Sequence, residues 1–573
     1  MYETVRAILC RTLEACRKAG LFEGDLPEFQ LSRPRRLEHG DVSANAALVL
    51  APRVGRPPRE VAEAIRARLD DPDSVLSTCE VAGPGFLNFR LSRDHWLGVL
   101  GTILAAGPDF GRGPSRDRPR ILLEYVSANP TGPLHVAHGR HAALGDSMAR
   151  VLRFAGFFVT TEFYVNDAGS KIDKFGASML ARRRGEAPPA DGYQGEYVAD
   201  LGRGLPEAEI GRASAWGVER MLEDIRDVLG RFGVHFDTWQ SERDLYDRGL
   251  VRAGLDDLRA RDWLEEREGA VWFRSTRAGD DKDRVVVRST GEPTYFAADL
   301  AYHREKFSRG HDLCIDLWGA DHHGLVPRLR AGIEALGHAP GDFEVVLMQF
   351  VNLLRSGRSV PMDKSSGNYV TLREVLDEVG ADAARFFLLM RRSDSTLDFD
   401  LDLAKRQSLD NPVYHVQYAC ARASAILRRA AELGFAVPSF DLALARRLAL
   451  DEEIALLRRL ADFEVLVQEV AAAREPHRVC FYLMELSQEF QSYYTRLQKV
   501  HGDPILPQLR HRVGDWRASW DTDKTAARLL WVTAVRRVIE NALSLIGVSA
   551  PERLDSPARA ADGGAAQQEV DDA

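Results

Sequence analysis

Hydrophobic and polar positions divide the chain into three parts with different periodicities. Residues 1–107 begin with apolar positions at helical spacing and end, at 81–90, with an alternating apolar run that follows Gly and Pro. This part is therefore predicted to be a small α+β domain. A stretch rich in Gly and Pro at 107–119 separates it from the rest and is typical of a linker.

The middle part, residues 118–395, alternates short apolar runs with helical periodicity. Buried strands are predicted at four places, 120–126, 157–165, 313–319 and 343–350. A long helical pattern starts near His135, between the first two strands. This order of strand, turn, helix and strand predicts a right-handed parallel crossover, and hence a Rossmann-type domain with a parallel sheet.

Three further stretches complete the predicted organisation. Residues from about 185 to 290 are expected to form an insertion of helices and a hairpin, which pairs 270–275 with 283–288. From 396 to 554 the strand signals vanish, and helical periodicity predicts an all-α domain. The last residues, 555–573, are rich in Ala, Gly, Gln and Asp and are predicted to be a disordered tail. The expected fold class is multidomain α/β.

The composition indicates a folded chain and limits the kinds of partner that it can attract. The 573 residues are 45% hydrophobic and 28% charged, which is ordinary globular usage and excludes collagen-like and wholly disordered proteins. The net charge of -9 removes any attraction of the whole molecule to polyanions, so a nucleic-acid surface has to be local. No apolar run is long enough for a membrane helix, and Glu3 is unlike a signal peptide. We therefore expect a cytoplasmic protein without a membrane segment.

Cysteine and lysine usage also bear on the chemistry. The 6 cysteines are scattered and show neither a Cys-x-x-Cys pair nor a Cys/His ligand spacing, so we expect reduced thiols and no structural metal. Only nine of the 76 basic residues are lysines. Each lysine therefore deserves notice as a candidate functional residue.

The most informative turn runs from Ser127 to Arg140 and contains His135 and His138 at the predicted start of a helix. Residues three apart share a helix face, and the N-terminus of a helix offers unpaired N–H groups and a positive dipole end. This arrangement suits a triphosphate, and imidazole N–H groups can stabilise charge that develops on an α-phosphate. The alternative from spacing alone is a helix cap with incidental histidines.

The longer string around these histidines resembles a known family. His135-Val136-Ala137-His138 looks like the His-Ile-Gly-His motif of class I aminoacyl-tRNA synthetases, and the whole motif at 128–138 resembles the form found in arginyl-tRNA synthetases. The resemblance implies that His135, Ala137, His138 and Gly139 bind ATP, with the two histidines catalytic. Ala137 departs from the family, which has Gly there.

A second segment, at 361–365, is similar to the Lys-Met-Ser-Lys-Ser loop of the same family. It keeps Met362 and Lys364 and is followed by Gly367, whereas Pro361 and Asp363 replace the first Lys and the Ser. A Gly-containing loop with one ammonium can close on the β- and γ-phosphates of ATP. The resemblance implies that Lys364 is the third catalytic residue; a solvated surface charge is the alternative.

A third group implies the amino-acid substrate. Tyr295 and Asp299 match the family's Tyr-x-x-x-Asp, and positions i and i+4 share one helix face. A carboxylate can accept two parallel hydrogen bonds from a guanidinium, which an ammonium or a neutral urea cannot reproduce. The alternative is an ordinary helix with a packed Tyr and an exposed Asp.

The resemblance carries further positions onto this sequence. Glu124 and Asn129 are implied to orient the α-amino group and side chain of arginine, and His322 to contact the amino acid. Gly319 and Asp321 are implied to contact ATP, because the segment at 318–324 occupies the place where the family meets ribose and amino acid. The adjacent histidines there also invite a metal site, but no carboxylate pair at ligand spacing completes one.

The resemblance covers residues 1–554 and implies a complete enzyme. It assigns an N-terminal domain that touches the tRNA elbow, the Rossmann catalytic domain, and a helical anticodon-binding domain at 396–554. The expected reaction is ATP-dependent ligation of L-arginine to tRNA(Arg) through arginyl-adenylate, with Mg²⁺ accompanying ATP and the chain acting as a monomer. Two alternatives stay open: an inactive or weakened tRNA-binding paralogue, and a nucleotidyl transferase that acts on a small acceptor.

Overall fold

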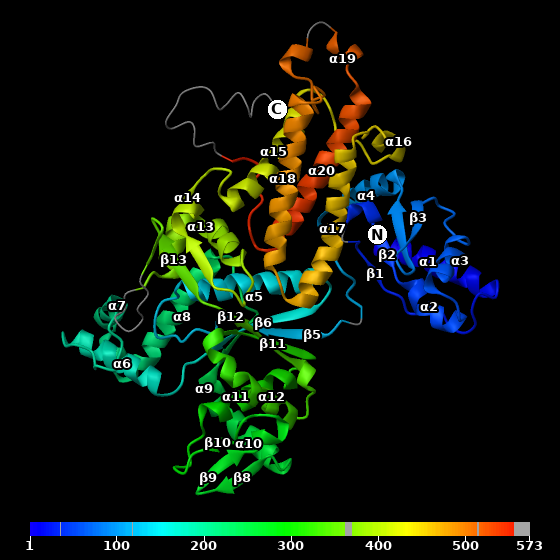
Figure 1. Cartoon of the computed structure of the whole chain (residues 1–573). Helices are drawn as coiled ribbons and strands as arrows, with labels where there is room; N and C mark the ends of the chain where they lie inside the picture. The colour runs from blue at the N-terminus through cyan, green and yellow to red at the C-terminus, as the bar shows by residue number, and fades with distance from the viewer. Residues whose placement is uncertain (35, 117, 361–368, 513–514, 555–573) are drawn as a thin grey trace.

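The computed structural model describes residues 1–34, 36–116, 118–360, 369–512 and 515–554. The predicted loop at 361–365 and the predicted tail at 555–573 lie outside the described residues. The described chain forms a parallel-sheet body in the middle, a helical bundle above it and a small N-terminal module beside the bundle (Figure 1). No described helix is both long and apolar enough to cross a membrane.

The N-terminal module combines four helices with an antiparallel sheet. Its strands pair in the order β1-β2-β4-β3, namely Leu31–Ser32, Val42–Ala44, Phe86–Leu91 and Leu76–Ala82. Its helices are α1 (Tyr2–Lys18), α2 (Ala46–Val54), α3 (Pro58–Arg66) and α4 (Arg93–Ala106). Gly40 requires its positive φ of 98° and the space of a missing Cβ, because a Cβ there would lie 2.6 Å from the Phe89 carbonyl oxygen.

The central sheet is parallel throughout and has the strand order β12-β11-β5-β6-β7. Its strands are β5 (Arg120–Glu124), β6 (Phe158–Val165), β7 (Thr238–Ser241), β11 (Leu313–Gly319) and β12 (Phe343–Met348). Helix α5 (Val136–Phe154) connects β5 to β6, as the sequence predicts. The fold class is confirmed as multidomain α/β.

Edge strand β7 corrects one boundary of the sequence analysis. It lies inside the span expected to be an insertion, yet it extends the parallel sheet beside β6. Helices α6 (Ser170–Arg183), α7 (Glu196–Gly204) and α8 (Ala213–Arg231) precede it. Four residues, Thr-Trp-Gln-Ser, are too short and too polar to give a strand pattern, which is why the sequence does not reveal this strand.

A second lobe hangs below the sheet, where Figure 1 shows it in green. It contains the predicted hairpin, β9 (Ala270–Phe273) with β10 (Arg284–Val287), and a third antiparallel strand, β8 (Leu264–Arg267). Four helices complete it: α9 (Glu242–Asp247), α10 (Leu250–Ala260), α11 (Tyr295–Ser308) and α12 (Val326–Ala335). Helix α11 returns the chain to the central sheet, directly before β11.

A small three-stranded sheet joins the body to the bundle. Strand β13 (Val351–Arg355) pairs antiparallel with β14 (Arg358–Ser359) and parallel with β15 (Leu397–Asp400). Strand β15 lies within the predicted all-α domain, so the expectation that strands end before 396 is wrong. Helix α13 (Leu372–Leu389) separates these strands in sequence, and α14 (Leu401–Lys405) follows them.

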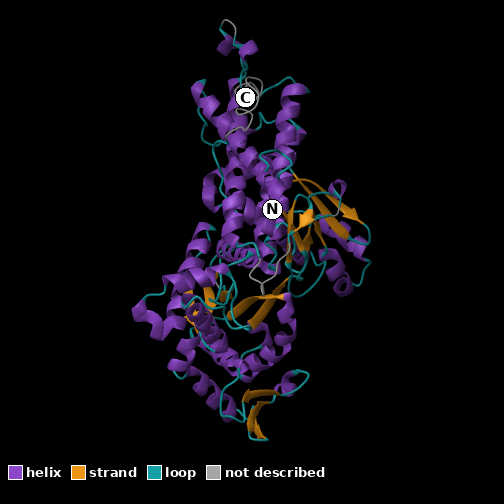
Figure 2. Cartoon of the chain, turned by 90° about the vertical axis from the view of Figure 1, so that its left-hand side faces the viewer, coloured by secondary structure: helices purple, strands orange, loops and turns teal. Residues whose placement is uncertain are grey.

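The bundle is helical, and Figure 2 shows it as purple rods above the orange strands of the central sheet. Four helices of more than 20 residues build it: α15 (Pro412–Glu432), α17 (Asp451–Ala473), α18 (His477–Lys499) and α20 (Thr522–Leu545). Two short helices, α16 (Leu442–Ala445) and α19 (Trp516–Ser519), lie between them. Asn411 caps α15 by accepting a hydrogen bond from the backbone N–H of Val413.

Contacts between distant segments join the parts into one body. Helix α4 packs against both α17 and α20, and Arg33 forms an ion pair with Asp462 in α17 at 2.6 Å. Arg385 of α13 is fully buried and donates to the carbonyl oxygens of Phe232 and Ile546 while it pairs with Asp146 of α5. One continuous hydrophobic core therefore runs from α1 through the sheet to α20.

Candidate active site

Several of the predicted site residues follow the carboxyl ends of two neighbouring strands in the parallel sheet. The chain leaves β5 toward β6 and leaves β11 toward β12, so the strand order reverses between these two neighbours. Parallel sheets open a crevice at such a switch point. The residues after β5 include His135 and His138, and those after β11 include Asp321 and His322, so both groups flank this crevice.

The two histidines begin helix α5. His135 is the N-cap residue, and its ring stacks on that of His138 with 3.8 Å between ring centroids. The backbone N–H of His135 donates to Nδ1 of His138 at 3.3 Å. In its neutral form His138 therefore carries its proton on Nε2. This arrangement presents imidazole N–H chemistry at a helix N-terminus that attracts phosphate.

The glycine of this motif has a packing role. A Cβ on Gly139 would lie 2.7 Å from Cδ1 of Leu372, the first residue of α13, so a side chain there would push the two helices apart. Ala137, two residues before it, is half-buried. Gly139 thus lets α5 and α13 approach each other, whatever it contributes to ATP.

Lys364 lies outside the described residues, but the chain that leaves its segment is anchored beside the histidines. The backbone N–H of Leu372 donates to the carbonyl oxygen of Leu134 at 2.7 Å, and Thr371 forms an isolated bridge with His135. The ring of Tyr369 meets His135 edge-on, with 5.9 Å between centroids. The described residues 369–372, which follow the predicted second motif in sequence, are therefore bonded to the first motif.

Helix α11 brings the predicted arginine-binding pair to the crevice. Tyr295 is its first residue and is 58% exposed, whereas Asp299, one turn later, is half-buried. The hydroxyl of Tyr295 lies near Gly169, where an added Cβ would be 3.3 Å away. Burial raises the pKa of Asp299 to about 6; His303, Arg328 and Lys306 act to lower it, and Glu124 adds to the rise.

Sequence reasoning missed a second carboxylate, Glu242, at the start of α9. It is 5% exposed, and among the described residues neither it nor Asp299 forms an ion pair; the charge of Lys171 acts on Glu242 from farther away, as those of Arg328 and Lys306 act on Asp299. Burial, followed by the charges of Asp299 and Asp167, raises the pKa of Glu242 to about 7. Glu242 is the first residue of a six-residue helix and belongs to no spaced motif, so the sequence gives no signal for it.

Glu124 is buried at the end of β5 and both of its oxygens are engaged. Lys306 donates to Oε2 at 2.5 Å, and the Ser127 hydroxyl donates to Oε1 at 2.8 Å. Burial raises the pKa of Glu124 although Lys306 acts to lower it. Asn129 is exposed two residues after Ser127. Lys306 is a lysine that the sequence did not connect with Glu124.

The segment after β11 adds an exposed carboxylate and an exposed imidazole to the candidate site. Gly319 ends the strand, and a Cβ there would lie 2.4 Å from Oδ1 of Asp321. Asp321 and His322 are both exposed and lie 3.6 Å apart, from Oδ2 to Nε2. His141 of α5, which the sequence analysis did not single out, interacts electrostatically with both. Burial and the charge of Arg140 lower the pKa of His141 to about 4, so its ring is neutral near pH 7.

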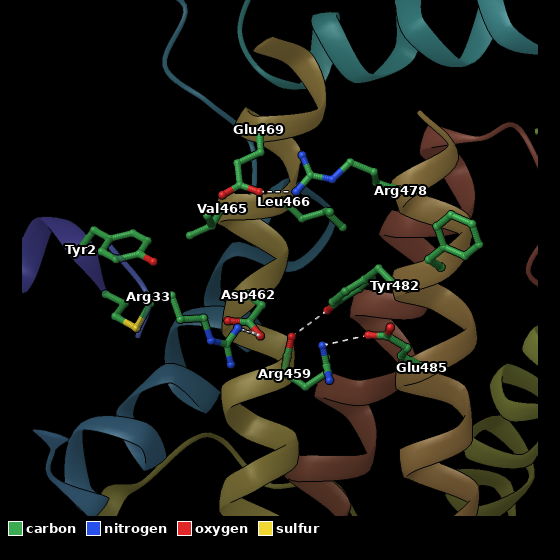
Figure 3. Close-up of a pocket in the computed structure, with 12 residues that line it drawn as sticks. Tyr2, Arg33, Arg459, Asp462, Val465, Leu466, Glu469, Arg478, Tyr482 and Glu485 are labelled. Carbon is green, nitrogen blue, oxygen red and sulfur yellow. Dashed lines mark hydrogen bonds and ion pairs between the residues drawn. The ribbon is translucent and has the colours of Figure 1, made fainter. Parts of the chain in front are cut away.

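Two further features of the described residues concern metal clusters and cavities. No group of three His, Cys, Asp or Glu among the described residues is arranged to hold a metal ion. A cavity of about 370 Å³ lies elsewhere, between the N-terminal module and helices α17 and α18 (Figure 3). Its charges pair with one another, as in Arg33 with Asp462 and Arg459 with Glu485, and no motif residue lines it.

Comparisons with known proteins cover all three parts of the chain. Residues 5–91 match the arginyl tRNA synthetase N terminal domain, 101–187 the class I (R) tRNA synthetase catalytic domain, and 416–554 the DALR anticodon binding domain. A curated relative from Syntrophotalea carbinolica, named arginine–tRNA ligase, is 47% identical over 97% of this chain and 100% of its own length. Another of that name, from Desulfosudis oleivorans, is 45% identical over the same shares.

Solved structures agree at the level of the fold. The arginyl-tRNA synthetase of Thermus thermophilus superposes with a TM-score of 0.73 over 96% of this chain and 100% of its own, at 24% identity. That identity speaks for the fold alone.

Proposed function

This chain belongs to the arginyl-tRNA synthetase family, which ligates L-arginine to tRNA at the expense of ATP, and from that premise we propose how its residues divide the reaction. Arginine carboxylate attacks the α-phosphate of ATP, pyrophosphate leaves, and the resulting arginyl-adenylate passes its acyl group to a terminal ribose hydroxyl of the tRNA. Nothing in the comparisons supports the alternatives of an inactive paralogue or a small-acceptor transferase.

The observation that best supports arginine as substrate is a buried carboxylate, Glu242, that interacts with a half-buried one, Asp299, with no ion pair to either among the described residues. Asp299 and Glu242 are proposed to receive the guanidinium, which offers five N–H donors in a planar fork. Tyr295, on the same helix face as Asp299, is proposed to cover the fork. A substrate without the fork would leave a buried carboxylate unsatisfied, and this penalty is the basis of selectivity.

The α-amino group is proposed to bind at the end of β5. Glu124 ends that strand, Asn129 follows it, and His322 follows the neighbouring strand β11. Each oxygen of Glu124 retains a second lone pair beyond those that Lys306 and Ser127 use, so the carboxylate can also accept from an ammonium.

ATP is proposed to bind between the start of α5 and the end of β11. His135 and His138 donate to the α-phosphate as charge develops there, Ala137 and Gly139 form the floor, and Gly319 and Asp321 meet the ribose. Lys364 is proposed to stabilise the leaving pyrophosphate. Magnesium is proposed to arrive with the phosphates of ATP and to neutralise part of their charge.

The remaining proposals concern partners and place. The helical bundle is proposed to bind the anticodon stem of tRNA(Arg), and the N-terminal module its elbow. We further propose that the protein acts as a monomer in the cytoplasm.

The test is ATP–pyrophosphate exchange by the full chain with each of the twenty amino acids, with and without total tRNA. We expect exchange with arginine alone, dependent on tRNA. Exchange with another amino acid would contradict the guanidinium site. Absence of exchange with all twenty, alongside retained tRNA binding, would favour the inactive paralogue.

A further inference from the structure

Lys306 is a completely buried lysine on α11 that binds two carboxylates at once. Its Nζ lies 2.5 Å from Oε2 of Glu124 and 2.7 Å from Oδ1 of Asp316, and it exposes no surface. Glu124 and Asp316 are direct partners on the neighbouring parallel strands β5 and β11, so their side chains lie on one face of the sheet. The ammonium thus separates two carboxylates that would otherwise repel each other.

Glu124 also contacts the turn that follows β5, and so links Lys306 to that turn. Its second oxygen accepts from the Ser127 hydroxyl at 2.8 Å, and that hydroxyl accepts from the backbone N–H of Tyr164 at 3.1 Å. Val126 and Ser127 have φ values of 68° and 40°, a left-handed conformation that side chains rarely adopt. Such residues persist only where surrounding contacts hold them, and Asn129 follows two residues later.

We propose that Lys306 is a positioning residue of the arginine site: through Glu124 and Ser127 it fixes the turn that presents Asn129. Lys306 also lies two helical turns after Asp299 on the same helix. It therefore sets the distance between the end of the site that receives the guanidinium and the end that receives the α-amino group. This inference rests on the substrate role proposed above for Glu124.

The test is the split between the KM for arginine and the KM for ATP, measured by tRNA-dependent ATP–pyrophosphate exchange with the full chain. In Lys306→Gln the KM for arginine is expected to rise at least tenfold, while the KM for ATP changes less than threefold. Lys306→Arg keeps a cation between the two carboxylates, so we expect it to recover at least half of the loss on a logarithmic scale.

Arg309→Gln is the matched control. Arg309 directly follows the same helix and pairs with buried Glu162 of β6 at 2.5 Å, and the carboxylate of Glu162 accepts from Arg309 and Tyr302, whereas Ser127 donates to Glu124. Loss of Arg309 removes a comparable ion pair between the end of α11 and the sheet, and we expect both KM values to stay within threefold of the unmodified chain. An equal rise in the arginine KM in Arg309→Gln would mean that Lys306 acts only by stabilising the fold. That result would overturn the proposal.

Two more variants separate the possible failures. Glu124→Gln tests the premise: an unchanged arginine KM there contradicts the proposed role of Glu124, whereas a raised KM with an unaffected Lys306→Gln overturns only the positioning role of Lys306. If Lys306→Gln does not fold, Ser127→Ala provides the test instead. It removes the hydrogen bond between Ser127 and Glu124, which is the next contact in the series that starts at Lys306. We expect at least a fivefold rise in the arginine KM for Ser127→Ala, and no rise would refute the proposal.

Discussion

At the scale of residues, the site depends on carboxyl groups, those of Glu242 and Asp299, whose pKa values are raised toward neutral pH. Asp299 could be found from its spacing to Tyr295, because a helix places both on one face. Glu242 could not, because it arrives from another helix and only the fold brings it beside Asp299. Glu124 was found, but its partner Lys306 lies 182 residues away in sequence and no local pattern links them.

The raised pKa values of Glu242 and Asp299 predict a pH-dependent affinity for arginine. As the pH falls from 8 to 6, Glu242 takes up a proton near 7 and Asp299 near 6, so the guanidinium loses its counter-charges. The KM for arginine, measured by pyrophosphate exchange, should rise over this range.

Glu242→Gln provides the control for that dependence. It should remove the step near pH 7 and raise the arginine KM at pH 8 by about 10- to 100-fold, as expected for a lost hydrogen bond between charged groups. A KM that stays flat between pH 6 and 8 in the unmodified chain would contradict the assignment.

Removal of one imidazole donor should slow activation without weakening arginine binding. His138→Ala is expected to lose about 2 to 4 kcal/mol of transition-state stabilisation, seen in kcat/KM for ATP, and Lys364→Ala a similar amount. His235→Ala, which changes an exposed histidine between α8 and β7, is the control and should keep full activity. Unchanged exchange in His138→Ala would refute its role.

At the scale of elements, apolar strands and long helices were predictable and short polar strands were not. The runs that became β5, β6 and β11 lie inside the central sheet and are largely buried, and β12 at its edge is half-buried, which is why these runs are apolar in sequence. Strands β7 and β15 are four residues long and occupy sheet edges, so they carry almost no pattern. Their pairing is decided by the chain that surrounds them.

The close approach of α5 to the end of β5 gives a stability prediction. A Cβ on Gly145 would lie 2.2 Å from Cγ of the Tyr125 ring, which is itself buried. Gly145→Ala should therefore lower the free energy of unfolding by about 1 to 3 kcal/mol through overpacking, measured by urea denaturation.

Gly98→Ala in α4 is the opposite case and serves as the control. Nothing lies within 4 Å of the added Cβ, so the substitution should stabilise by about 0.5 to 1 kcal/mol through helix propensity. Equal effects of the two substitutions would contradict the packing argument.

At the scale of the whole molecule, the three parts share one hydrophobic core, a feature that sequence patterns cannot show. Periodicity identifies the buried face of α4 but not that this face meets α17 and α20. Arg385 likewise joins α5, the end of α8 and the end of α20 from a single position in α13.

Arg385→Met should destabilise the whole molecule. Its loss leaves two buried carbonyl groups without their donor and removes one partner of Asp146, although Arg150 still pairs with that carboxylate at 2.7 Å. We expect a loss of about 3 kcal/mol in the free energy of unfolding by urea denaturation.

Arg373→Met, on the same helix, removes a partly exposed pair with Asp224 and is expected to cost less than about 1 kcal/mol. If Arg385→Met were as mild as Arg373→Met, the junction would not hold the parts together.

The packing of α4 on the bundle has a consequence for how the protein is made. The apolar face of α4 includes Trp96, Leu97 and Leu100, and its partner α20 is complete only about 440 residues later. At roughly 5 to 20 residues per second, a ribosome needs about 20 to 90 s to cover that distance. Until then the hydrophobic surface of the nascent N-terminal module that α20 will cover stays exposed. We therefore expect ribosome-associated chaperones to bind this module during synthesis.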